Sequence, residues 1–121
     1  MRIYYASMTG NVRRFIAKLG VEATDINTNP IADTPFILVC YTFGFGAVPK
    51  EVSEWLARNN GNLRGVAVSG NRNWGGYYGL AGDIISKQYG VPLLHKFELS
   101  GNDDDVRIFK ERAERLCDTT N

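Results

Sequence analysis

The hydrophobic positions of this chain form blocks of two kinds: short apolar runs, and longer stretches in which apolar residues recur every three or four positions. Short runs predict strands, and the longer spacing predicts helices with one buried face. Five strands are expected in this way, at residues 3–6, 21–26, 36–42, 63–69 and 91–99. Four helices are expected to start near residues 12, 49, 80 and 103, each directly after a strand or after the loop that follows one.

Residues with special backbone preferences mark the ends of these helices. Gly20 ends the first helix and Gly90 ends the third, while Pro49 takes the first helical position of the second. The acidic run 103–105 opens the last helix, where the helix dipole favours negative charge. We therefore interpret this run first as a helix start, and only second as a possible binding site. Residues 27–35, with two prolines, are expected to be a loop.

The third strand decides the fold class, because residues 36–42 are apolar at nearly every position. Such a strand must be covered on both faces, as in a parallel sheet between two layers of helices. Strands that alternate with helices favour an α/β fold with right-handed crossovers. We expect a single domain over residues 1–121, a three-layer sandwich with a five-stranded parallel sheet in the flavodoxin-like order 2-1-3-4-5. Its ligand would lie at the carboxyl edge, between strands 1 and 3.

Length and charge narrow the possible functions. The 121 residues suffice for one hydrophobic core but not for two. The 14 Lys and Arg against 13 Asp and Glu leave a net charge of +1, so no global field would recruit nucleic acid or an anionic membrane. The longest apolar run, residues 36–41, is too short to cross a bilayer, and charges interrupt residues 1–20. We expect a cytoplasmic protein with a protein or small-molecule partner.

The cysteines and the single histidine suggest no metal site. Cys40 and Cys117 lie far apart in apolar settings, form no CxxC pattern, and are expected to be buried, reduced thiols. His95 lies in the middle of a predicted strand with no acid or cysteine close to it in sequence. No catalytic or ligand role is expected for it.

The turn after the first strand carries the clearest chemical signal. It has the sequence Ser-Met-Thr-Gly-Asn-Val over residues 7–12, where a helix starts. The Ser7 and Thr9 hydroxyls, the Asn11 amide and the unpaired N–H groups of a helix start can together bind a phosphate. The turn lacks the Lys of a nucleoside-triphosphate loop and the glycines of a dinucleotide fingerprint, which leaves a terminal phosphate monoester. The alternative is an ordinary N-cap, since helices prefer to begin with these residue types.

Two further loops at the same edge of the predicted sheet combine glycine with aromatic residues. Residues 42–48 have the sequence Thr-Phe-Gly-Phe-Gly-Ala-Val, and residues 70–79 have Gly-Asn-Arg-Asn-Trp-Gly-Gly-Tyr-Tyr-Gly. Glycine lets the backbone approach a ligand, and aromatic faces form a slot for a flat ring. A phosphate site beside such a slot indicates flavin mononucleotide, FMN. Alternatively, the aromatic residues are loop anchors that pack on the edge of the sheet.

Four motifs resemble a known family. S-M-T-G-N-V, T-F-G-F-G-x-V-P, S-G-N-R-N-W-G and K-F-E-L-S-G occur in the order found in the NrdI proteins, short flavodoxin-like partners of the class Ib ribonucleotide reductase. The resemblance covers nearly the whole chain. Flavodoxins proper are usually longer and have a second Thr where this sequence has Val12. Many family members also carry an acid where this chain has Gly76, so the role of that acid does not carry over to this position.

The resemblance implies a cofactor, partners and an activity. The cofactor is FMN, and the partner is the dimanganese or diiron radical-generating subunit of class Ib ribonucleotide reductase. Reduced flavin would react with oxygen to supply the oxidant that activates this subunit, and a flavin or thiol-linked reductase would supply the electrons. No nucleic acid, membrane or metal ion is implied for this chain itself. The flavin, rather than a catalytic side chain, would perform the redox step.

The resemblance also assigns residues to the cofactor. Those expected to hold the phosphate are Ser7, Met8, Thr9, Gly10, Asn11 and Val12. Those expected to line one side of the ring are Thr42, Phe43, Gly44, Phe45 and Gly46. Those expected on the other side and at the pyrimidine edge are Gly70, Asn71, Trp74, Gly75, Tyr77 and Tyr78. Gly44 is the candidate for a peptide that turns its carbonyl toward flavin N5 on reduction, because glycine adopts both peptide orientations at little cost.

The charges around the three loops predict the field at the ring. The loops contain no Asp or Glu, whereas Arg13, Arg14, Lys50 and Arg72 lie in or beside them. We therefore expect a neutral to positive field.

Three other functions remain open at this point. A general flavodoxin-type one-electron carrier would need the same cofactor. A receiver-like signalling or interaction domain on the same fold would need an acidic pocket around a phosphorylatable Asp, which the ends of strands 1 and 3 do not supply. A ligand-free scaffold would bind no flavin.

Overall fold

A computed structural model describes residues 1–119 of the chain. The strands are β1 (Arg2–Tyr5), β2 (Thr24–Asp25), β3 (Phe36–Tyr41), β4 (Leu63–Gly70) and β5 (Leu93–Glu98). The α-helices are α1 (Asn11–Leu19), α2 (Lys50–Asn59), α3 (Leu80–Tyr89) and α4 (Asp103–Thr119). Three 3₁₀ helices connect them, η1 (Ile26–Thr28), η2 (Asn60–Asn62) and η3 (Arg72–Tyr77). Within residues 1–119, no helix is both long and apolar enough to cross a membrane.

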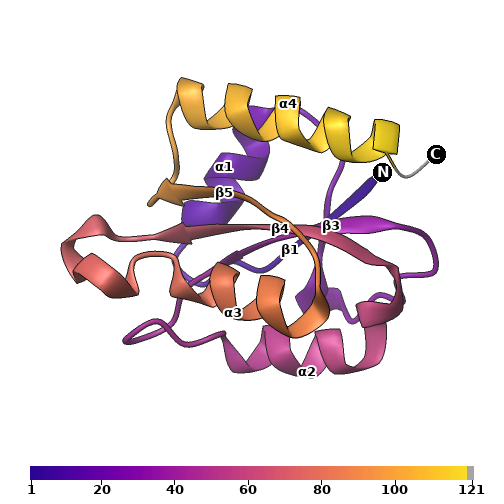
Figure 1. The fold of residues 1–121 in the computed structure, drawn as a ribbon, viewed down its shortest axis with the longest axis horizontal. Coiled ribbons are helices and arrows are strands. Elements are labelled where there is room, and N and C mark those ends of the chain that lie inside the picture. The colour runs from indigo at the N-terminus through magenta and orange to yellow at the C-terminus, as the bar shows by residue number, and fades with distance from the viewer. Residues whose placement is uncertain (120–121) are drawn as a thin grey trace.

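The five strands form one parallel sheet in the order β2-β1-β3-β4-β5, which confirms the predicted fold. Helices α1 and α4 cover one face of the sheet, and α2 and α3 cover the other (Figure 1). Both interfaces are apolar because β3 is buried on both faces, from Phe36 to Cys40. On one face, Phe15 of α1 stacks on Phe97 of β5 with ring centroids 3.9 Å apart. On the other, Trp55 of α2 packs against Phe36, with centroids 5.3 Å apart.

The second strand is shorter than the pattern predicts. The predicted strand 21–26 is reduced to Thr24–Asp25, which pairs only with β1. Val21 is exposed, and the Asp25 carboxylate accepts the N–H of Asn27 at 2.9 Å, which starts η1 at Ile26. A local side-chain hydrogen bond thus ends the strand where alternation alone would continue it.

Two further boundaries differ from expectation. Pro49 is the N-cap of α2 rather than its first residue, with an extended ψ of 140°, and the helix begins at Lys50. The expected loop 70–79 contains η3, a short helix broken at Gly75, where φ is 55°. This glycine permits the kink because a side chain would be strained at that φ.

The register brings four connections to one edge of the sheet. Tyr5 pairs with Val39, Tyr41 with Ser69, and Gly70 with Glu98, so the chain leaves all four long strands on the same side. In a parallel sheet this is the carboxyl edge, where ligands of open α/β folds bind. The fold therefore positions one more loop at this edge than the three expected from the sequence.

Candidate site at the carboxyl edge of the sheet

A cleft of about 200 Å³ lies at the carboxyl edge. It is lined by residues from all four connections: Ser7, Met8, Thr9, Asn11, Val12, Tyr41, Thr42, Gly44, Ser69, Gly70, Asn71, Trp74, Tyr77, Gly79 and Leu99. Most of the residues predicted from the three loops are in this set. Those predicted but placed outside the lining are Gly10, Phe43, Phe45, Gly46, Gly75 and Tyr78.

The start of α1 forms one end of the cleft, which we call the hydroxyl cup: Ser7, Thr9, Asn11 and the first N–H groups of α1. The N-cap is Gly10, whose φ of 89° lies in the left-handed region and which has no side chain to satisfy those N–H groups. Ser7 Oγ accepts the N–H of Arg13 at 3.3 Å, as a helix cap would. Ser7 thus satisfies one N–H of the first turn, although the N-cap residue itself is Gly10. The N–H groups at the first two helical positions form the positive end of the helix dipole.

Residues 42–48 form a tight turn beside the cup. Phe43 and Ala47 exchange two backbone hydrogen bonds, of 2.9 and 2.8 Å, so that the turn closes on itself. The turn requires glycine twice, because φ is 55° at Gly44 and 97° at Gly46. A Cβ at Gly46 would also lie 2.8 Å from the Leu80 side chain, whereas a Cβ at Gly44 would meet nothing within 4 Å. Of the two glycines in this turn, only Gly44 combines backbone freedom with open space.

The opposite wall comes from residues 70–79. The Asn71 side chain accepts the N–H of Asn73 at 2.9 Å, which begins η3. Gly70 lies so close to the end of this loop that a Cβ would be 2.8 Å from the amide nitrogen of Gly79. The loop is therefore folded back tightly onto the end of β4.

Four exposed aromatic side chains lie on the two glycine-rich loops, and we call Phe43, Phe45, Trp74 and Tyr77 the aromatic rim. Trp74 and Tyr77 line the cleft, whereas Phe43 and Phe45 lie outside its lining. The exposed fractions of the four side chains range from 46% to 72%, so they are not loop anchors buried on the sheet. Phe45 contacts Trp74 edge to face with centroids 5.2 Å apart, and lies 6.3 Å from Tyr77. Tyr78 differs, since it is partly buried and its hydroxyl has no hydrogen-bond partner among the described residues.

The fourth connection, residues 98–101, was missed as part of the site. Leu99 lines the cleft, is 47% exposed, and has a φ of 54°, which is unusual for a residue with a side chain. Ser69 Oγ donates to the Leu99 carbonyl oxygen at 2.6 Å, and the Leu99 N–H donates to the Gly70 carbonyl oxygen at 2.9 Å. The signal was the K-F-E-L-S-G motif at residues 96–101, which spans the end of the fifth predicted strand and had no assigned role.

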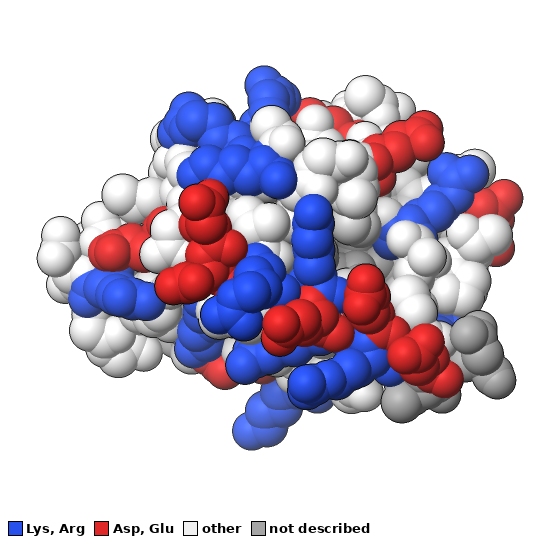
Figure 2. Space-filling model, turned by 90° about the horizontal axis from the view of Figure 1, so that it is seen from above, with Lys and Arg blue, Asp and Glu red and all other residues white. Residues whose placement is uncertain are grey.

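The electrostatic expectation for the site needs one correction. Although the three predicted loops lack acids, the Glu98 carboxylate reaches the third loop and accepts the N–H of Arg72 at 3.2 Å. Two of the expected basic residues face other acids: Arg13 lies 3.3 Å from Asp25, and Lys50 lies 3.9 Å from Glu54. On the face formed by α1 and α4, basic and acidic side chains are interspersed rather than gathered into one field (Figure 2).

A tyrosine that lines the cleft is anchored to α2. The Tyr41 hydroxyl donates to the Glu51 carboxylate. Burial, and then this hydrogen bond and the charge of Glu51, raise the pKa of Tyr41 above its ordinary value. Burial likewise raises the pKa of the neighbouring Cys40 thiol to about 12. Both groups are therefore neutral near pH 7, and the prediction for Cys40 is confirmed.

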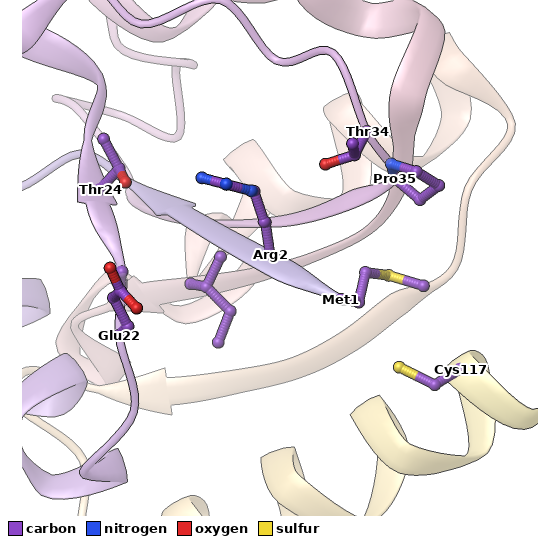
Figure 3. Close-up of a pocket in the computed structure, with 9 residues that line it drawn as sticks. Met1, Arg2, Glu22, Thr24, Thr34, Pro35 and Cys117 are labelled. Carbon is purple, nitrogen blue, oxygen red and sulfur yellow. The ribbon is translucent and has the colours of Figure 1, made fainter.

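A larger cavity, of about 600 Å³, lies at the opposite edge of the sheet. Figure 3 shows Arg2, Glu22, Thr24, Thr34 and Cys117 around it. No aromatic residue lines it, in contrast to the carboxyl edge. Cys117 is only partly buried there, so its predicted burial was wrong: it lies near the end of α4 and lines this cavity.

His95 has a partner that its sequence neighbourhood did not reveal. Its Nε2 lies 2.6 Å from Asp105 Oδ1, and both side chains are largely buried. The other oxygen of Asp105 accepts the N–H of Asn102, while the Asn102 side chain accepts the N–H of Asp105. This reciprocal pair is a capping box, which confirms the role of the acidic run as a helix start. The contact between His95 and Asp105 joins β5 to α4, on the face of the sheet that α4 covers.

Comparisons with known proteins agree with the geometry. A family model described as NrdI flavodoxin like matches residues 3–111. The protein named NrdI from Macrococcus caseolyticus is 48% identical over 119 residues, which cover 98% of this chain and 92% of that protein. The protein named NrdI from Bacillus licheniformis is 45% identical over 117 residues, which cover 96% and 89%. A solved short-chain flavodoxin associated with a bacterial microcompartment matches with a TM-score of 0.71 and 25% identity, over 99% of this chain and 97% of that one.

Proposed function

This chain belongs to the NrdI flavodoxin-like family, and on that premise we propose that it is an FMN-binding redox protein that supports class Ib ribonucleotide reductase. The family and the flavodoxin neighbour support FMN as the cofactor. One observation carries the proposal for this chain: a phosphate-type donor set and two exposed aromatic side chains, Trp74 and Tyr77, line a single cleft at the carboxyl edge.

The residues present fit FMN. The hydroxyl cup offers hydroxyl and N–H donors and no carboxylate, as a phosphate monoester requires, and a helix N-terminus adds positive potential. The enclosed volume, about 200 Å³, is below the range of roughly 300–1,000 Å³ typical of small-molecule sites. It suits the phosphate and its sugar chain, so the flat ring would lie between residues 42–48 and residues 70–79. The absence of Asp and Glu from the cleft-lining residues disfavours the receiver-like alternative.

Each part of the cleft has a distinct task in this proposal. Ser7, Thr9 and the α1 N–H groups bind the phosphate and set the depth of the cofactor. Gly44 and the backbone of residues 70–75 allow close approach to the ring, while Trp74 and Tyr77 exclude water from one side of it. The neutral Tyr41, held by Glu51, contributes to the lining of the cleft. Bound FMN would supply the redox chemistry: one electron would reduce oxygen to superoxide, and two electrons with two protons would give hydrogen peroxide.

The finer assignments form the rest of the proposal. The oxidant would pass to the dimanganese or diiron radical-generating subunit, and a flavin or thiol-linked reductase would supply the electrons. The aromatic rim suits a protein partner, since exposed aromatic side chains around a site are typical of docking surfaces. The location predicted from the sequence, the cytoplasm, belongs to the same proposal.

The similarity to a short-chain flavodoxin favours a second candidate, a general one-electron carrier. The two candidates share the cofactor and differ in the fate of its electrons. A carrier passes electrons to several acceptors and gains nothing from oxygen. An activator needs oxygen and one specific partner.

Two experiments test the proposal. The purified protein is first titrated with FMN, and a chain that stays colourless and cannot be loaded contradicts both candidates. The loaded, reduced protein is then mixed with oxygen, Mn²⁺ and the radical-bearing subunit of a class Ib ribonucleotide reductase, and the tyrosyl radical is followed by electron paramagnetic resonance. Radical formation that requires both this chain and oxygen supports the activator. Equal radical yields with an unrelated flavodoxin favour the carrier.

A further inference from the structure

The Arg14 side chain folds back over the start of α1. A Cβ on Gly10 would lie only 2.8 Å from Arg14 Nη1. The guanidinium therefore covers the N-cap residue. Its Nε donates to Ser100 Oγ at 2.9 Å, and its Nη2 donates to Asn11 Oδ1 at 2.6 Å. Ser100 Oγ in turn donates to the same Asn11 oxygen at 2.9 Å. The three side chains form a closed triangle beside the hydroxyl cup.

This triangle determines which way the Asn11 amide points. A guanidinium has only donors, so the Asn11 atom that faces Arg14 must be the oxygen. The amide nitrogen therefore faces the other way, and it lies 3.4 Å from Thr9 Oγ1 within the cup. Asn11 lines the cleft, whereas Arg14 does not. Arg14 thus acts on the cleft through Asn11 and through its charge.

The turn that carries Ser100 is held firmly against α1. Lys18, in the last turn of the helix, donates to the Gly101 carbonyl oxygen at 2.7 Å. Gly101 has a φ of 71°, and a Cβ there would lie 2.8 Å from the Phe15 ring. Leu99 of the same turn lines the cleft. The position of Ser100, and with it that of Arg14, is therefore fixed by the packing of α1 on the 98–101 turn.

We propose that Arg14 and Ser100 are positioning residues that orient the Asn11 amide N–H groups toward the phosphate of FMN and so make the cleft selective for the phosphorylated flavin over riboflavin. This rests on the proposed function only in requiring that the chain binds FMN. An amide held by two donors at its oxygen loses no rotamer freedom when its nitrogen donates to the ligand. The guanidinium adds one positive charge behind the cup, which favours a dianion and leaves neutral riboflavin unaffected.

The test compares Arg14→Gln and Ser100→Ala with Arg13→Gln, a matched control. Arg13 is the adjacent residue, carries the same charge, and its guanidinium lies beside Asp25 instead of Asn11. Dissociation constants for FMN and for riboflavin are measured by flavin fluorescence at fixed ionic strength. We expect Arg14→Gln to weaken FMN binding about tenfold or more, the scale of a lost charge-assisted hydrogen bond, with riboflavin unchanged. Ser100→Ala should act in the same direction by less, and Arg13→Gln should leave the FMN to riboflavin ratio unchanged.

A double-substitution cycle separates positioning from packing. If Arg14 acts through Asn11, Arg14→Gln costs less FMN affinity in an Asn11→Ala background than in the parent. Equal losses of FMN and riboflavin in Arg14→Gln, or an equal change in Arg13→Gln, would overturn the inference, because they indicate a loss of packing or of net charge alone. A parent protein that binds no FMN contradicts the proposed function. A parent that binds FMN and an Arg14→Gln variant that binds it equally well contradict only the role of Arg14.

Discussion

The hydroxyl cup and the aromatic rim are the two ends of one cleft, and they are built in opposite ways. The polar side chains of the cup are hydrogen-bonded to one another or to the α1 backbone, and Asn11 is fixed by two donors. The rim consists of exposed aromatic residues on loops that turn at Gly44, Gly46 and Gly75, all with positive φ. The cup is prearranged by these hydrogen bonds, whereas the rim side chains are exposed and the loops that carry them turn at glycines.

This difference assigns different tasks to the two ends. Prearranged donors contribute to affinity because little entropy is lost when the phosphate binds. A glycine-rich wall contributes little affinity but lets the backbone change with the state of the ring. Substitutions in the cup should therefore change how tightly FMN binds, and substitutions at the rim should change its potentials and rates.

The largest effect is expected from Thr9→Ala in the cup. Loss of one charge-assisted hydrogen bond costs roughly 1.5–3 kcal/mol, so FMN binding should weaken about tenfold or more. Riboflavin binding and thermal unfolding should stay near the parent values. The control is Thr34→Ala, at the opposite edge of the sheet, in which FMN binding, riboflavin binding and thermal unfolding should all match the parent. Titration by flavin fluorescence measures both ligands. A Thr9→Ala variant that binds FMN as tightly as the parent would place the phosphate elsewhere.

The next effect concerns Gly44, where the comparison predicts altered potentials at nearly unchanged affinity. Gly44→Ala meets no atoms within 4 Å but is strained at a φ of 55°, so a peptide that must turn on reduction would cost about 1–2 kcal/mol more. The gap between the two one-electron potentials of bound FMN should change accordingly in a redox titration.

Gly20→Ala is the control for this change, because Gly20 has a similar φ of 66° and equally open surroundings, at the far end of α1. Unchanged potentials in both Gly44→Ala and Gly46→Ala would remove the idea of a turning peptide. A shift in Gly20→Ala as large as in Gly44→Ala would mean that general strain, not the ring, is measured.

A charge at the rim should have a smaller effect on the second reduction potential. A Cβ at Gly76 meets nothing within 4 Å, so Gly76→Glu adds a carboxylate near the ring at roughly 1 kcal/mol per close charge. This charge should lower the potential of the second electron, because it disfavours an anionic reduced flavin. Glu98→Gln should raise that potential while its amide oxygen still accepts the Arg72 N–H.

Gly61→Glu, with equally open surroundings at the opposite edge of the sheet, is the matched control for added charge. Potentiometry at two salt concentrations measures all three variants, and the shifts should shrink as salt rises. The electrostatic account fails if Gly76→Glu and Gly61→Glu shift the potential equally.

The smallest effect is expected from Phe45→Ala. Phe45 joins the two walls of the rim through its edge-to-face contact with Trp74, which is worth about 0.5–1.5 kcal/mol. Without it the mouth opens more readily, so stopped-flow association of FMN and of riboflavin should both become severalfold faster. Ile31→Ala, which removes another exposed apolar side chain, should change neither rate. Association that slows in Phe45→Ala would mean that the rim is not a barrier to entry.

The fold, its strand order and three of the four loops that meet at the site could be predicted from the sequence. The apolar run from Phe36 to Cys40 required cover on both faces, and the alternation of strands with helices required a parallel sheet. Such patterns are local, and the carboxyl edge of a parallel sheet collects its loops by topology alone. Ser7, Thr9, Asn11 and Trp74 could therefore be assigned to one cleft before any contact was known.

The side chains that complete the site depend on tertiary packing. Ser100 lies 89 residues beyond Asn11, and Glu98 lies 26 residues beyond Arg72, yet each is hydrogen-bonded to its partner at the carboxyl edge. No period or spacing encodes such pairs, because they depend on how α1 packs against the turn after β5. The left-handed Leu99 has the same origin, because Ser69 and Gly70 of β4 bind its carbonyl oxygen and its N–H. The shortening of β2 at Asp25 has a local cause instead, the hydrogen bond from the Asn27 N–H to the Asp25 side chain.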